Sequence, residues 1–168
     1  MISRNIVTDI LFIAMLVVLQ VFIFNRIVIM DKYVPVLYLI FVMFYPFNRD
    51  RFQFLGLSFV LGLSIDLFAG TWGINACATV LVAYVRIQIF KTASDLDSDF
   101  FSFESLQWIQ FLGFIFMNIL MHQLLVQGIE YFKFSRLLEI IIDVLMTSLL
   151  SFVFIVFYVL IFKIKQKV

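Results

Sequence analysis

Residues 52–86 read FQFLGLSFVLGLSIDLFAGTWGINACATVLVAYVR, and Asp66 is the only acidic residue in this stretch. A carboxylate this deep in an apolar run costs roughly 2.5–3.5 kcal/mol on insertion scales, so it should face protein or a cavity and not lipid. At helical spacing Ser58, Gly62, Asp66 and Gly70 share one face, which is small and polar. We therefore expect this helix to form an internal wall of a helix bundle.

The composition is that of a membrane protein. Hydrophobic residues make up 64% of the 168 residues and charged residues 14%, whereas soluble domains have about 45–50% and about 25%. Apolar runs extend from residue 6 almost to the last residue, which predicts one all-α transmembrane domain covering 1–168. The single cysteine, Cys77, excludes an intramolecular disulfide. The net charge of +1 gives no indication of nucleic-acid binding.

Apolar runs near the ~20 residues that a spanning helix requires predict six transmembrane helices in a compact bundle. The runs cover residues 6–24, 33–47, 52–68, 74–90, 106–127 and 137–162. The first is not followed by a small-residue cleavage site, so we interpret it as an uncleaved span. The second is short, reaching about 22 Å against a hydrocarbon core of about 30 Å, and it contains Pro35 and Pro46.

The distribution of basic residues predicts the orientation. With six spans, one side of the membrane carries eight basic residues and the other carries four. The first group is Arg4, Arg49, Arg51, Arg86, Lys91, Lys163, Lys165 and Lys167; the second is Arg26, Lys32, Lys133 and Arg136. Because cytoplasmic loops are enriched in Lys and Arg, both termini are predicted to be cytoplasmic.

The predicted helix hairpin around Asp66 is rich in glycine, serine and alanine, which permits close backbone approach in membranes. The short turn before residue 74 places Asp66 near Asn75, at the start of the next helix. Asp66 could lock the hairpin by accepting hydrogen bonds from that helix's backbone, from Asn75 and from Thr79. It could instead line a ligand pocket or contact a partner, together with Gly62 and Gly73. The sequence leaves both interpretations open.

Two other helices carry polar stripes. Asp143, Thr147 and Ser151 recur every fourth residue in the last run, with Glu139 and Arg136 expected to pair at the interface. Asp143 and Asp66 are expected at similar depth, which would suit either a cation or proton site or two separate hydrogen-bonded pairs. In the fifth run, Asn118 and His122 share a face, and a lone histidine there is expected to be a hydrogen-bonded interior residue. No further metal ligands stand at fitting spacing, so no metal site is predicted.

Motifs for catalysis are missing from the sequence. It contains no P-loop, HExxH or GxSxG motif, and we predict neither an enzyme nor a bound cofactor. The longest connection, 91–105, is acidic. It reads either as a solvated linker that caps the next helix or as a docking strip for a basic surface.

The hairpin sequence resembles the signature region of the MreD family of bacterial rod-shape-determining membrane proteins. The shared pattern is Gly-Leu-x-x-Asp (here Gly62, Leu63 and Asp66), a short turn, and then a glycine (here Gly73) followed by small residues. The segment VPVLYLIFVMFYPF, at 34–47, is similar to the family's second span. Asn75 departs from the histidine that many relatives carry at this position.

This resemblance implies a non-enzymatic subunit of the cell-elongation machinery in the bacterial inner membrane. The implied partner is a bitopic MreC-like protein, and indirectly MreB, RodA and a penicillin-binding transpeptidase; the lipid bilayer and a second copy of the chain are the other expected contacts. The family's fold resembles the S components of energy-coupling-factor transporters, so a micronutrient-binding S component is the alternative. Such subunits usually carry an Ala-x-x-x-Ala motif on the first helix, where this chain has Ala14 alone.

Overall fold

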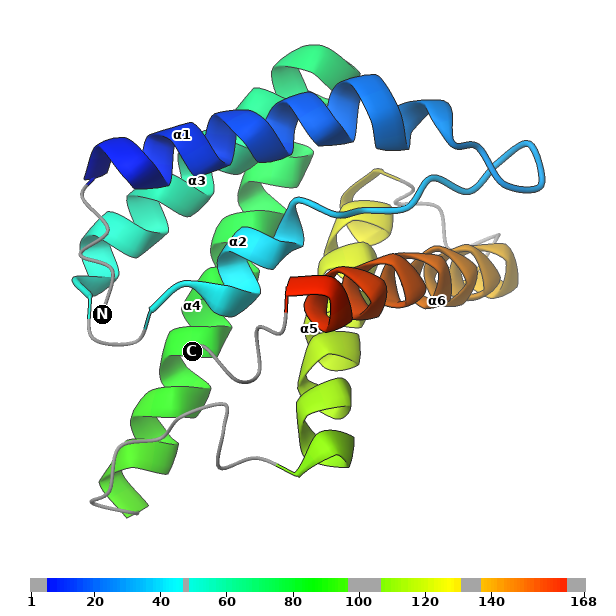
Figure 1. Cartoon of the computed structure of the whole chain (residues 1–168). Coiled ribbons are helices and arrows are strands. Elements are labelled where there is room, and N and C mark those ends of the chain that lie inside the picture. Colours follow the sequence, from blue (N-terminus) through cyan, green and yellow to red (C-terminus); the bar gives the residue numbers. More distant parts are fainter. Residues whose placement is uncertain (1–5, 47–48, 97–106, 131–136, 163–168) are drawn as a thin grey trace.

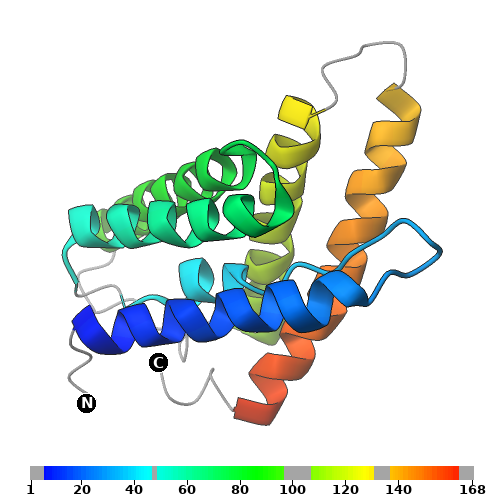
Figure 2. The ribbon, with the colours of Figure 1, turned by 90° about the horizontal axis from the view of Figure 1, so that it is seen from above.

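The computed structural model describes residues 6–46, 49–96, 107–130 and 137–162, with the main chain alone at 91–96 and 137, and its long elements are all helices (Figure 1). In chain order they are α1 (Ile6–Val18), a π-helical turn η1 (Leu19–Ile23), a 3-10 turn η2 (Phe24–Arg26), α2 (Leu39–Phe44), α3 (Arg51–Ala69), α4 (Ile74–Leu96), α5 (Trp108–Glu130) and α6 (Leu137–Phe162). The helices are not parallel: α6 crosses α1 at a steep angle (Figure 2).

Four helical segments are long and apolar enough to cross a membrane: Ile6–Arg26, Arg51–Ala69, Trp108–Glu130 and Leu138–Phe162. A shorter apolar helix covers Ile74–Phe90. Large apolar side chains are exposed along these helices, including Leu67 on α3 and Phe157 on α6. Soluble monomers rarely expose contiguous apolar surface on this scale. The chain is therefore a helical membrane protein.

The helices agree with five of the predicted runs to within a few residues at most ends. The C-terminal end of α4 differs more, because the helix continues to Leu96 whereas the run was expected to end at residue 90. The sixth prediction, the second run, contains much less helix than expected. The predicted helix over 33–47 contains only the six residues of α2, preceded by extended chain.

Two prolines explain the shortness of α2. A residue before proline is pushed out of the helical region, and proline itself lacks the N–H that a helix interior needs. Pro35 therefore keeps the incoming chain extended. Tyr45, just before Pro46, has φ −64° and ψ 134° and ends the helix.

The short helix α2 is the centre of the core. All six of its residues have exposed fractions between 0% and 8%, as expected for a helix that is apolar on every side. It lies between α1, α4 and α5 (Figure 1). Beside it, α3 and α4 form the most closely packed pair of helices, a hairpin, and α5 packs against α6.

Candidate functional site

Asp66 joins the two helices of the hairpin. Its Oδ1 accepts hydrogen bonds from the Thr71 hydroxyl (2.6 Å), the Asn75 amide N–H (3.0 Å) and the Asn75 side-chain amide (3.0 Å). Its Oδ2 accepts from the backbone N–H of Ala76 at 2.8 Å. The carboxylate therefore satisfies backbone donors in the first turn of α4, where an anion is favoured by the helix dipole. The predicted hydrogen bonds to Asn75 and to the backbone are confirmed.

Thr79 was expected to donate to Asp66 and does not. Its hydroxyl instead donates to the backbone oxygen of Asn75 at 2.6 Å, one turn earlier on α4. This is the ordinary bond of a threonine within a helix.

Gly62 lies where the two helices approach most closely. A Cβ added to Gly62 would lie 2.5 Å from the Cα of Ala76 and 2.7 Å from the backbone oxygen of Asn75. Only glycine permits this distance between the helices. Gly62 is thus buried within the hairpin and is not available as an exposed contact surface for a partner.

The turn between the helices depends on glycine conformations. Gly70 ends α3 with φ 71°, and its N–H bonds the carbonyl of Asp66 at 2.8 Å. Gly73 has φ 88°, and a Cβ added to it would have nothing within 4 Å. Between them Trp72 is 99% exposed, so its side chain is free to lie in the interfacial region that tryptophan prefers.

A buried polar chain extends from the hairpin through α2 to α5. The Tyr38 hydroxyl, just before α2, donates to Asn75 Oδ1 at 3.0 Å and lies 3.0 Å from Nε2 of His122. Since the single hydroxyl proton is used by Asn75, His122 Nε2 must be the donor to Tyr38. The other nitrogen, Nδ1, is then an acceptor, and it has no hydrogen-bond partner among the described residues. His122 is fully buried and hydrogen-bonded, as predicted.

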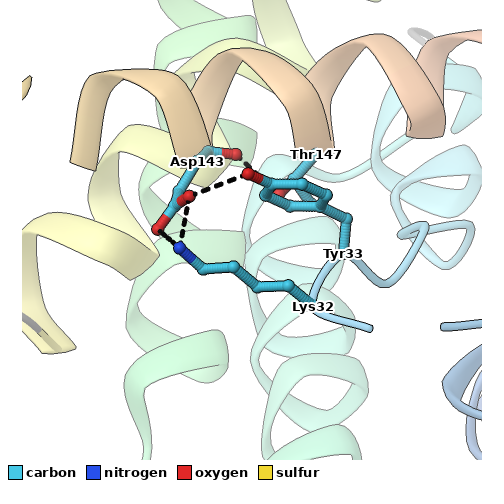
Figure 3. A network of polar contacts seen from close by, with 4 residues as sticks. All are labelled: Lys32, Tyr33, Asp143 and Thr147. Atoms are coloured by element: carbon cyan, nitrogen blue, oxygen red, sulfur yellow. Dashed lines mark hydrogen bonds and ion pairs between the residues drawn. The ribbon is translucent and has the colours of Figure 1, made fainter. Parts of the chain in front are cut away.

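Asp143 belongs to a different network, on α6 (Figure 3). Lys32 Nζ lies 2.6 Å from both carboxylate oxygens, and the Tyr33 hydroxyl donates to Oδ1 at 3.2 Å. The hydrogen bond to Asp143 raises the pKa of Lys32 above its usual value. One turn further, Thr147 donates to the backbone oxygen of Asp143 at 2.7 Å.

A third polar cluster, not predicted from the sequence, lies at the C-terminal end of α2. Asp9 is fully buried, with its Oδ2 3.3 Å from Nη1 of Arg49 and 3.5 Å from the Tyr45 hydroxyl. Arg86 donates to the backbone oxygen of Tyr45 at 2.5 Å and lies 5.1 Å from the ring centre of Phe54. Arg86 thus binds a free carbonyl at the end of α2. The sequence signal for this cluster was two isolated charges, Asp9 and Arg86, each within a different apolar run.

The structure brings together four of the five predicted site residues. Asp66, Gly62, Gly73 and Asn75 lie in the α3–α4 hairpin, whereas Asp143 lies on α6 with Lys32. Of the two interpretations of the carboxylates, the separate hydrogen-bonded pairs are confirmed. Within residues 6–96, 107–130 and 137–162, so far as they are described, no three His, Cys, Asp or Glu side chains lie close enough to hold a metal ion.

Two predictions fall outside the described part of the chain. Arg136, the expected partner of Glu139, is one of the residues 131–136. Of the acidic connection 91–105, the structure describes only the helical main chain up to Leu96.

No known protein family matches the chain, and no curated protein or solved structure matches it.

Proposed function

We propose that the chain is a non-enzymatic, multi-pass subunit of the bacterial cell-elongation machinery, located in the inner membrane. The observation that carries this proposal is the hairpin pattern Gly62-Leu63-x-x-Asp66 with Gly73, which resembles the MreD signature. The contacts support treating the pattern as a unit, because its glycine and its acid both act between the same two helices: Gly62 permits the contact with Ala76, and Asp66 binds the start of α4.

The hairpin is proposed to serve as a rigid contact element for a bitopic MreC-like partner. In lipid, apolar side chains give little selectivity between helices, so recognition depends on shape and on satisfied polar groups. Because Gly62 is covered by Ala76, the partner would contact the outer side of the hairpin and the exposed Trp72. MreB, RodA and a transpeptidase would be reached indirectly through that partner.

The topology proposed with this function has six crossings and two cytoplasmic termini. The extended chain together with α2 would serve as a thin second crossing. Non-helical backbone at membrane depth is tolerated where protein covers it and satisfies its polar groups. That condition is met here by Gln20, which accepts from Leu37 N at 2.8 Å, and by Ser151, which accepts from Val36 N at 2.8 Å.

Depletion of the chain in its own bacterium tests the function. Rod-shaped cells should become round, and the wild-type chain should restore them. Gly62→Leu should fail to restore the rods, because its side chain collides with Ala76. Gly56→Leu is the matched control: Gly56 lies on the same helix with nothing within 4 Å of its added Cβ, and it should restore the rods. Unchanged cell shape on depletion would refute the proposal.

One observation favours the alternative, a micronutrient-binding S component. Nδ1 of His122 and the hydroxyl of Ser148 are both buried without a hydrogen-bond partner in the described part of the chain. Buried polar atoms of this kind are the ones a small polar molecule would satisfy. The alternative predicts that the tagged chain co-purifies with a pair of ATPases and their membrane coupler.

A further inference from the structure

The segment 27–38, here called the strap, connects η2 to α2 and contains no helix. Its base is held by neutral hydrogen bonds from two helices. Gln20 accepts from Leu37 N at 2.8 Å and donates to the oxygen of Pro35 at 3.0 Å, while Ser151 accepts from Val36 N at 2.8 Å. Gln20 and Ser151 are 2% and 0% exposed, so water does not compete for these bonds. The base of the strap is therefore firmly anchored.

The tip of the strap is strained. Ile29 and Tyr33 exchange two backbone hydrogen bonds of 2.9 Å, and the turn between them puts Met30 and Asp31 at φ 55° and 56°. Residues other than glycine seldom adopt this left-handed conformation, and two in succession are costly. Besides its own hydrogen bonds, the turn is held by a contact with α6.

That contact is the pair formed by Lys32 and Asp143 of α6, supported by the Tyr33 hydroxyl (Figure 3). The two ends of the pair differ in exposure, since the Lys32 side chain is 56% exposed and that of Asp143 is 12% exposed. Water and salt therefore reach the lysine while the base of the strap stays dry. The hydrogen bond from the Tyr33 hydroxyl to Asp143 places Tyr33 at the face of α6 that also carries the buried Thr147, one turn after Asp143 (Figure 3).

We propose that the strap is a hinged cover whose tip is latched to α6 by the Lys32–Asp143 pair. When the pair separates, the tip relaxes and swings away while the anchors at Pro35–Leu37 hold. The movement uncovers the face of α6 that carries Asp143 and Thr147. This inference concerns a movement of the chain and does not depend on the proposed function.

Thiol labelling of the full chain in detergent micelles tests the hinge. The exposed Cys77 is first replaced by serine, and a reporter is introduced by Thr147→Cys, which removes only a bond within α6. The probe is a water-soluble maleimide linked to polyethylene glycol, followed by its shift on a gel. Lys32→Met should raise the labelling rate about threefold to fivefold, in line with the loss of a half-exposed ion pair. In the protein that keeps Lys32, added salt should raise the labelling rate toward the same value.

Two controls separate local opening from other effects. Arg26→Met removes an exposed positive charge at the end of η2, directly before the strap. Arg26 forms no ion pair within the described part of the chain, so this substitution should leave the rate unchanged. A reporter at Ser58→Cys, fully buried in α3, should stay unlabelled in the Lys32→Met background. A rate at Thr147→Cys that Lys32→Met does not change, or that Arg26→Met raises equally, overturns the proposal. Equal labelling at Ser58→Cys overturns it too, because the whole chain would then be opening.

Discussion

Replacing Asp66 with leucine should be the most damaging single change in the hairpin. The carboxylate accepts four hydrogen bonds, two of them from the backbone N–H groups of Asn75 and Ala76 at the start of α4. The side chains of Thr71 and Asn75 already bond each other at 2.9 Å, so they keep a partner after the substitution. The two backbone donors do not, and Ala76 is 2% exposed.

The expected magnitude follows from those two donors. Leaving a buried donor unsatisfied costs about 1–3 kcal/mol, and losing an N-terminal helix cap costs about 0.5–2 kcal/mol. Because these costs overlap, Asp66→Leu should lower the free energy of unfolding by about 2–4 kcal/mol. Asp66→Asn keeps one oxygen for the three donors on Oδ1 but turns its NH2 group toward the buried N–H of Ala76, which then has no acceptor, so about 1–3 kcal/mol is expected.

Asp50→Leu is the matched control. Asp50 also caps a helix, with its Oδ1 accepting from Phe52 N at 2.7 Å at the start of α3, but this bond is exposed to solvent. Water replaces the lost acceptor there, so a cost of about 0.5–1 kcal/mol is expected. Unfolding in mixed micelles with increasing sodium dodecyl sulfate measures all three variants. Equal destabilisation by Asp66→Leu and Asp50→Leu would refute the reasoning.

Three further predictions concern the close helix contact, the buried chain and the latch. Gly62→Ala should lower the unfolding free energy by about 1–3 kcal/mol through overpacking, whereas Gly56→Ala should be neutral or slightly stabilising; the same micelle titration decides this. Tyr38→Phe removes the donor to Asn75 Oδ1 and leaves His122 Nε2 with only the Thr79 hydroxyl at 3.4 Å; it should cost about 1–2 kcal/mol in that titration, and a change within error would contradict the assigned pair of hydrogen bonds. The pKa of Lys32 is raised above 10.5, so the charge of the lysine is fully present below that value and is lost only as pH rises through the higher folded value. Labelling at Thr147→Cys, corrected for the reactivity of the thiol, should therefore not change between about pH 6.5 and 8.5 on account of the lysine.

The hairpin could be predicted from the sequence because its determinants are local. Asp66 and its partners in α4 lie within ten residues of each other, and the turn between them is too short to permit another arrangement. Helical spacing alone then places Gly62 on the same face as Asp66. The acid and the small residues therefore identified the helix contact and the bonds from Asn75 and the α4 backbone, whereas the donor Thr71 was not predicted and the expected donor Thr79 was wrong.

The rest of the site depends on contacts between distant segments, which helical spacing does not encode. Lys32 and Asp143 are 111 residues apart, and Tyr38 and His122 are 84 apart. Residues 33–38 of the strap were hidden inside the apolar run 33–47, which satisfies the composition of a span. The two prolines of that run, Pro35 and Pro46, were the available signal, since proline restricts both itself and the residue before it.

Affinity purification of the tagged chain from its native membrane tests the proposed function most directly. An MreC-like bitopic protein should be recovered together with peptidoglycan synthases; at equal abundance of the two variants, Gly56→Leu should retain this recovery and Gly62→Leu should reduce it. Recovery of a pair of ATPases with their membrane coupler, and no MreC-like protein, would contradict the proposed function.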